Sequence, residues 1–200
     1  RNAADMNIRL SLFKHARDKL VQNETVKKSY LKKANEVKRI YKAYLPDRVE
    51  KDYAERAYHI RKIANAIRSL DPEVEIDEVL NKVEALLDRS IIGYDLPDPE
   101  DDKKLYNLAT IDFDALREKF ESSKTKRTHT EGLKNSLAAD ITKMARVNKV
   151  RMNYMEKLND LIGEYNDGAK TVEETFKKLM ELAEQLKEEE KRYIKEELEN

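Results

Sequence analysis

One long stretch of the chain repeats its apolar residues with the period of an α-helix. From residue 128 to 166, successive members are three or four positions apart, which places them on one stripe of a 3.6-residue helix. The stripe contains Leu137, Ile141, Met144, Asn148, Arg151, Met155, Leu158, Ile162 and Tyr165, of which Asn148 and Arg151 break the apolar pattern. A second apolar face beside it contains Val147, Val150, Tyr154, Leu158 and Leu161. We therefore predict one long helix over about 128–166, with neighbours on two sides.

Shorter helical patterns lie on both sides of this stretch. They predict helices over 5–22, over 26–44, between Asp47 and Asp71, and over 76–88, then one opening at Asp112 and one opening at Thr171. Capping patterns mark several of the expected starts, namely Asp47 with Glu50, Asp112 with an Ile111–Leu116 staple, Thr128 with Glu131, and Thr171 with Glu174. Residues 23–25 offer either a cap or a kink between the first two helices. Asn166-Asp167-Gly168 predicts the end of the long helix. With no strand pattern and no repeat, we expect an all-α fold: an elongated multi-helix bundle organised on the long helix.

The helical pattern of apolar residues stops between Ser90 and Asp102, where Gly93, Pro97 and Pro99 stand among acidic residues. This segment predicts a linker. We expect an N-terminal helical half over 1–95 and a C-terminal helical half over 96–200, together forming one continuous helical domain. The chain starts at an arginine and stops within a helical pattern, so we interpret it as part of a larger polypeptide.

Composition narrows the function classes. Charged residues make up 40% of the 200 residues and apolar residues another 40%, with only four Gly and four Pro, which suits long, packed helices. The formal net charge is zero, so no global field favours nucleic acid or anionic lipid. The absence of cysteine removes disulfides and thiol chemistry and fits a reducing compartment. No membrane span or signal peptide is evident, and we expect a cytoplasmic protein without membrane contact.

Charge is nevertheless uneven along the chain. Residues 26–44 carry seven basic side chains and one acidic side chain, Glu36. The plain interpretation is a solvated helix face that complements acidic parts of the chain. The alternative is a ridge that makes weak, salt-sensitive contacts with phosphates. The candidates for such contacts are Lys27, Lys28, Lys32, Lys38 and Arg39.

Catalytic and metal-binding patterns are lacking. The histidines His15, His59 and His129 have no metal-ligand spacing, and there is no phosphate-binding glycine loop or nucleophile motif. The pair Asp112 and Asp114 suits a helix cap and first-turn acid better than a catalytic pair. We expect no catalytic residue, cofactor site or metal site within the chain.

Asn148 and Arg151 leave three interpretations open. Both could be exposed to solvent, or they could form a buried polar network that fixes the packing register. They could also meet another domain or subunit, with Arg151 pairing an acid there. We take Asn148, Arg151 and the nearby Tyr154 as candidate interface or packing residues.

Two segments of the C-terminal half are characteristic: Leu108-Ala109-Thr110-Ile111-Asp112-Phe113-Asp114-Ala115-Leu116-Arg117-Glu118-Lys119-Phe120, and Asn148-Lys149-Val150-Arg151-Met152-Asn153-Tyr154. Through these segments the C-terminal half resembles the C-terminal helical domain of the restriction (motor) subunit of type I restriction-modification enzymes. The resemblance is clear over about 105–192 and looser over 1–95. Lys149 departs from relatives, in which proline is frequent there, and so leaves the expected long helix unbroken.

The resemblance implies a function for the whole subunit. Such subunits carry a nuclease domain and two ATP-driven DNA-translocation domains, which need ATP and Mg²⁺, upstream of the helical domain. The helical domain is expected to be non-catalytic and to dock this motor onto the methyltransferase and specificity subunits, reaching DNA through the full complex. Two rivals remain: a nucleic-acid contact module that uses the basic helix 26–44, and a free-standing coiled-coil scaffold that forms homodimers.

Overall fold

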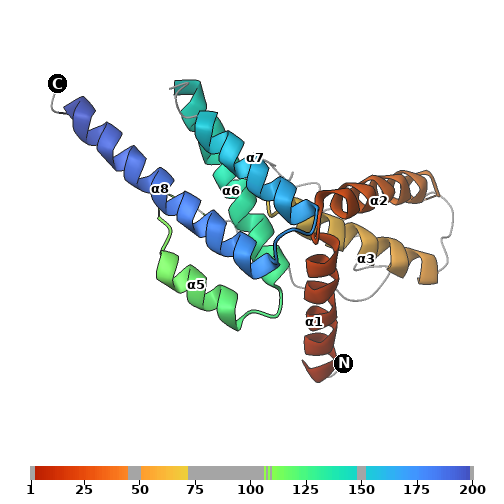
Figure 1. Ribbon diagram of the computed structural model, residues 1–200. Helices are drawn as coiled ribbons and strands as arrows, with labels where there is room; N and C mark the ends of the chain where they lie inside the picture. The colour runs from red at the N-terminus through yellow and green to blue at the C-terminus, as the bar shows by residue number, and fades with distance from the viewer. Residues whose placement is uncertain are drawn as a thin grey trace. The chain divides into compact units, whose positions relative to one another are not determined.

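The described part of the chain is helical. The structure, a computed structural model, describes residues 3–44, 51–71, 106, 108, 110–147 and 152–198. Its helices are α1 (Ala3–Leu20), α2 (Glu24–Tyr44), α3 (Lys51–Arg68), α5 (Phe113–Ser122), α6 (Lys126–Val147), α7 (Met152–Asn166) and α8 (Val172–Leu198) (Figure 1). Within these ranges there is no strand, which confirms the prediction of an all-α fold.

The chain divides into two compact units. The first contains residues 1–69 and 74–101, and the second contains residues 70–73 and 102–200. Residues just after α3 group with the second unit, where the carbonyl of buried Leu70 accepts a hydrogen bond from Asn135 Nδ2 at 3.2 Å. The division at 95/96 into halves of one continuous domain stays a prediction.

In the first unit, α2 and α3 pack along each other and α1 contacts both. Small buried side chains, Ala34 on α2 and Ala64 on α3, lie where these two helices face a common pocket. Small residues let helix backbones come close. The Tyr30 hydroxyl of α2 accordingly reaches the α3 backbone and donates to the Ile60 carbonyl at 3.0 Å. The packing of α2 on α3 therefore brings their polar side chains together as well.

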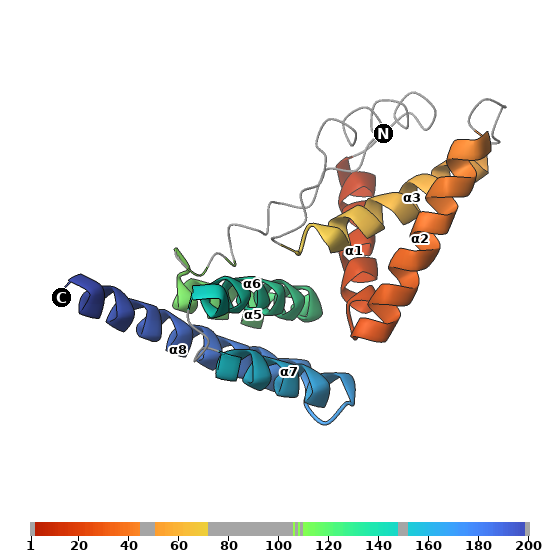
Figure 2. The ribbon, with the colours of Figure 1, turned by 90° about the horizontal axis from the view of Figure 1, so that it is seen from above.

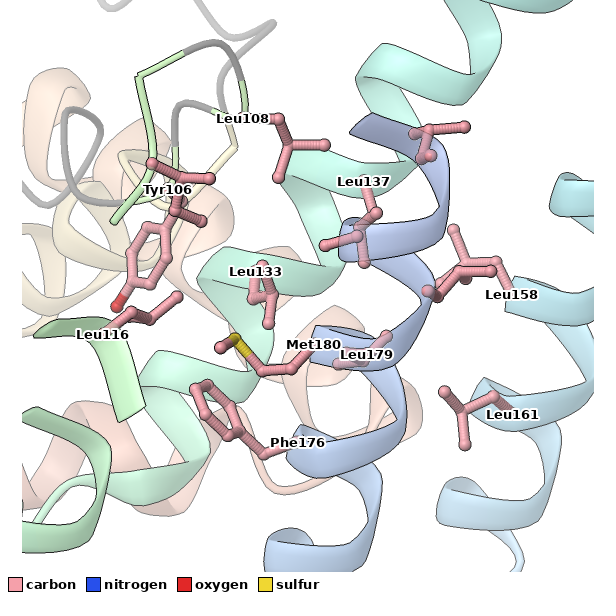
Figure 3. Close-up of a cluster of buried hydrophobic side chains, with 14 of the residues drawn as sticks. Tyr106, Leu108, Leu116, Leu133, Leu137, Leu158, Leu161, Phe176, Leu179 and Met180 are labelled. Atoms are coloured by element: carbon pink, nitrogen blue, oxygen red, sulfur yellow. The ribbon is translucent and has the colours of Figure 1, made fainter. Parts of the chain in front are cut away.

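In the second unit, α6, α7 and α8 pack against one another in every pair, and α5 packs against α6. Figure 2 shows α7 running alongside α8. One hydrophobic core joins all four helices. Its members labelled in Figure 3 are Tyr106, Leu108, Leu116, Leu133, Leu137, Leu158, Leu161, Phe176, Leu179 and Met180. The rings of Phe120 on α5 and Phe176 on α8 stack with centroids 3.7 Å apart, so α5 is tied to α8 through an aromatic contact.

The longest of the described helices, α8, changes its surroundings along its length. Among residues 172–192, whose side chains are described, the last buried one is Leu186, and Lys187 Nζ donates to the Ile111 carbonyl at 3.2 Å. The side chains of residues 188–192 are exposed or half-buried. In Figure 1 the C-terminal part of α8 runs away from α6 and α7.

The single long helix predicted over 128–166 is wrong. α6 ends at Val147, α7 begins at Met152, and the two helices run in opposite directions against each other (Figure 1). The apolar stripe predicted one continuous helix because the two helices face the same core. Leu137 on α6 and Leu158 on α7 both belong to it, so the apolar period continues unchanged from one helix into the next. The chain has Lys149 where proline was expected, and this substitution did not make the helix continuous.

Several predicted helix ends are confirmed. Asn23 Oδ1 accepts from the Val26 N–H at 2.9 Å at the start of α2. Asp112 Oδ1 accepts from the N–H groups of Asp114 and Ala115 at 3.1 and 3.0 Å and so caps α5. α7 ends at Asn166, and Gly168 follows with a left-handed φ of 75° that favours glycine.

The predicted start of a helix at Thr128 with Glu131 is wrong. α6 begins two residues earlier, at Lys126, so Thr128 lies in its first turn and is buried. The first backbone hydrogen bond of the helix is accepted by the Thr125 carbonyl from the His129 N–H at 3.4 Å, and Ser123 Oγ accepts from the Thr125 N–H at 3.0 Å just before the helix. The Thr128 pattern matched a capping box, but the helix already includes Thr128 in its first turn.

Some predictions fall outside the described residues. They concern the helix over 76–88, the linker over 90–102, and the cap formed by Asp47 with Glu50.

Candidate functional site

Three of the candidate phosphate-contacting residues form an exposed stripe on α2. Lys28, Lys32 and Arg39 are exposed, and their spacing of four and seven residues places them on one face of the helix. Lys28 Nζ lies 4.0 Å from Glu24 Oε2, and Glu36 follows Lys32 by one turn. The face therefore carries three basic side chains and two acidic ones, because Glu24 precedes the stripe and Glu36 lies within it, between Lys32 and Arg39.

The other two candidates lie elsewhere on the helix. Lys27 is half-buried, and its Nζ pairs with Glu24 Oε1 at 2.6 Å. Lys38 is half-buried and lines a small pocket between α2 and α3. The structure thus separates the five predicted residues into an exposed stripe, an ion-paired lysine and a pocket residue. Phosphate contact by any of them stays a prediction.

The pocket between α2 and α3 has an unusual polar lining. Its walls consist of Ala34, Asn35 and Lys38 from α2 and Arg61, Ala64, Asn65 and Arg68 from α3. Three of these seven side chains are cationic and two are amides, and no carboxylate occurs among the described residues that line it. Such a lining suits an oxyanion better than a cation or an apolar ligand.

Arg68 is held in place by two amide side chains. Its Nη1 donates to Asn65 Oδ1 at 3.0 Å, and its Nη2 donates to Asn35 Oδ1 at 2.7 Å. Both acceptors are neutral, so they orient the guanidinium without neutralising it. Burial lowers the pKa of Arg68, while the nearby Tyr30 opposes that shift. The same burial raises the pKa of Tyr30 to about 12.

Arg61 lies deeper and also has neutral contacts. Only 8% of the residue is exposed, and its Nε donates to the Ala57 carbonyl at 3.3 Å. Its Cζ lies 4.8 Å from the centroid of the Tyr41 ring, within the range of a cation–π contact. Arg61 thus brings positive charge into the packed interface of α2 and α3.

Sequence reasoning did not single out the α3 side of this pocket. A signal was present, because Arg61, Asn65 and Arg68 follow one another at steps of four and three and so share one helix face. That signal shows a polar face, but it does not show which helix packs against it.

The second predicted group is only partly described. Asn148 and Arg151 lie outside the described residues. Tyr154 on α7 is half-buried and packs against the core of the second unit, with Lys157 Nζ 5.3 Å from its ring centroid. Tyr154 has a packing role, and an interface role for all three residues stays a prediction.

The histidines lie in different settings. His129 is buried between Tyr106 and Ser123, whose hydroxyl oxygens lie 2.7 Å from its Nδ1 and 3.1 Å from its Nε2. His15 Nδ1 contacts the Ser11 carbonyl on the surface of α1, and His59 on α3 lies beside Glu55. In the described part of the chain, no group of three His, Cys, Asp or Glu side chains is arranged to hold a metal ion. Among the described helices, none combines the length and apolar character needed to cross a bilayer.

Comparison with known proteins identifies a family whose model matches the chain. The family model described as "Type I restriction enzyme HindI endonuclease subunit-like, C-terminal" matches residues 2–200. The match includes the N-terminal residues, where the sequence resemblance was loose. No curated protein and no solved structure gives a significant match.

Proposed function

Because the chain belongs to the family of type I restriction enzyme HindI endonuclease subunit-like C-terminal domains, we propose that it is a non-catalytic assembly domain. Its role is to dock the ATP-dependent motor and nuclease of the subunit onto the methyltransferase–specificity core. In this proposal the ATP and Mg²⁺ chemistry belongs to other domains of the subunit. The observation that carries the proposal is the family match over nearly the whole chain.

The packing supports a mechanical role. One core ties α5, α6, α7 and α8 together, and capped helix ends fix where α5 begins. Close-packed interiors deform little and transmit strain. Such an interior suits a domain that holds the motor at a fixed distance from the methyltransferase–specificity core. The candidate contact region is the neighbourhood of Asn148, Arg151 and Tyr154.

The test measures association of the 200-residue chain with a purified methyltransferase–specificity complex, for example by sedimentation. We expect the wild-type chain to bind and Arg151→Ala to weaken binding with an unchanged circular dichroism spectrum. Arg56→Ala is the matched control, because Arg56 is an exposed arginine on α3. Absence of binding by the wild-type chain would contradict docking. Equal binding by Arg151→Ala and Arg56→Ala would remove Arg151 from the contact region.

A second candidate function is nucleic-acid contact through α2. The exposed stripe of Lys28, Lys32 and Arg39 favours it, because lysine and arginine bind phosphates without regard to base sequence. A titration with duplex DNA at two salt concentrations tests it: weakening of binding with salt supports contact, and absence of binding at low salt contradicts it.

A further inference from the structure

The pocket between α2 and α3 concentrates positive charge in a confined space. Lys38, Arg61 and Arg68 line it together with two amides. The buried alanines Ala34 and Ala64 complete the lining and carry no polar side-chain atoms. The cationic groups of the three long side chains therefore provide the binding chemistry of the pocket. Amide N–H groups and guanidinium groups are both donors to oxyanions.

Arg68 is already positioned for a ligand. Two neutral acceptors, Asn35 and Asn65, fix its guanidinium before anything binds. A fixed donor loses less conformational entropy on binding than a mobile side chain does. Because Arg68 is also partly desolvated, an anion in the pocket would offset a cost that the folded chain already bears.

The surroundings of the pocket favour a linear polyanion. On α2 the exposed Lys28, Lys32 and Arg39 lie next to the pocket side of the helix, and their axial separations are roughly 6 and 10 Å at 1.5 Å per residue. A small phosphate compound would leave this stripe unused. The compact unit that contains α2 and α3, residues 1–69 and 74–101, has twenty basic and seventeen acidic residues, so its net charge is slightly positive although the whole chain is neutral.

We propose that Lys38 and Arg68, at the mouth of the pocket between α2 and α3, contact a backbone phosphate of duplex DNA, with Arg68 as the oriented donor and the α2 stripe contacting neighbouring phosphates. This site rests on the second candidate function, nucleic-acid contact through α2, and adds α3 to it. The contacts are with phosphate alone, so binding is independent of DNA sequence.

The test is fluorescence anisotropy of a labelled duplex of about 20 base pairs titrated with the 200-residue chain at several salt concentrations. We expect Arg68→Gln to weaken binding about tenfold at low salt and to reduce the salt slope by about one. Arg68→Lys keeps the charge and should recover part of the affinity. Lys119→Gln removes an exposed charge from α5 and should change the affinity less than twofold, or about 0.4 kcal/mol.

The outcomes separate the pocket from the stripe. If Lys32→Gln/Arg39→Gln weakens binding while Arg68→Gln behaves like Lys119→Gln, the pocket proposal is overturned and contact through α2 stands. If the wild-type chain does not bind at low salt, both fail. If polyglutamate displaces the duplex at equal charge concentration, the ligand is an acidic polypeptide and the DNA assignment is overturned. Should Arg68→Gln lose its helical spectrum, Lys38→Gln at the same pocket decides by the same criteria.

Discussion

Gly132 on α6 packs against the ring of Tyr106. A Cβ added at this glycine would lie 2.3 Å from Tyr106 Cε2 and 2.7 Å from two further ring atoms. The ring has little freedom to move away, because it is buried and its hydroxyl lies 2.7 Å from His129 Nδ1. The sequence marks Gly132 only as a weak helix former, whereas its place in the fold depends on the missing side chain.

We therefore expect Gly132→Ala to lower the free energy of unfolding by about 1–3 kcal/mol, as overpacking does. Gly163→Ala is the matched control, since nothing lies within 4 Å of its added Cβ on α7. Removing a helical glycine there should raise the free energy of unfolding by up to about 1 kcal/mol. Urea unfolding of both variants measures the difference, and equal effects of the same sign would contradict the close contact.

Tyr30 gives a pH dependence. Burial raises its pKa to about 12, against the weaker opposing effect of Arg68, while the unfolded chain has a tyrosine pKa near 10. The folded state therefore holds this proton more tightly. The resulting stabilisation is fully present below about pH 10 and is lost as the pH rises toward 12.

Between about pH 9 and pH 11.5 we expect the free energy of unfolding to fall more for the wild type than for Tyr30→Phe. The phenylalanine variant cannot ionise at this position. The difference between the two pH profiles therefore excludes the contribution of the other tyrosines and the lysines. Parallel pH profiles for the two proteins would show that the Tyr30 hydroxyl is not shifted.

At the scale of the helix, ends were easier to predict than continuity. A cap such as Asp112 is a local event, because the side chain bonds to N–H groups two and three residues away. The reversal between α6 and α7 is not local. Leu137 and Leu158 keep the same period whether they lie on one helix or on two that face one core. Periodicity reports which residues are buried, and it does not report what they are buried against.

The same limit applies to the candidate site. The basic residues of α2 are evident in the sequence, but their partners Arg61 and Arg68 come from α3. Arg68 and Asn35 are 33 residues apart and meet only because the two helices pack together. Whether a charged residue lies on a stripe or in a pocket depends on that packing. The sequence analysis therefore supplied one of the seven residues that line the pocket, Lys38, and none of its geometry.

The start of α8 allows a direct test of local stabilisation. The Thr171 N–H donates to Glu174 Oε2 at 2.8 Å and the Glu174 N–H donates to Thr171 Oγ1 at 3.2 Å, as the capping-box pattern predicted. We expect Thr171→Ala to lower the free energy of unfolding by about 1 kcal/mol. Thr25→Ala, at an exposed threonine inside the first turn of α2, should change it by less than about 0.5 kcal/mol in urea unfolding. Similar losses for both would contradict the cap.

For the whole molecule, the zero net charge conceals a strong internal contrast. Residues 1–71 contain twice as many basic as acidic residues, eighteen against nine, while residues 72–101 contain two basic and ten acidic residues. The total alone argues against nucleic-acid contact, and the compact unit that contains α2 has only a small excess of basic residues, twenty against seventeen acidic. Net charge is informative for the part of the chain over which a partner would bind, because charges beyond a Debye length of about 8–10 Å are largely screened.

The change from buried to exposed side chains between Leu186 and residues 188–192 of α8 implies that backbone protection is graded along one helix. Residues up to Leu186 share the core of the second unit, whereas residues 188–192 have exposed or half-buried side chains. Amide hydrogens before Leu186 should exchange with solvent only when the core opens, and those of residues 188–192 should exchange by fraying. Hydrogen–deuterium exchange would show a boundary within α8, and uniform protection to its end would mean that something else covers it. The helix thus combines an anchored segment with one that a partner could capture without disturbing the fold.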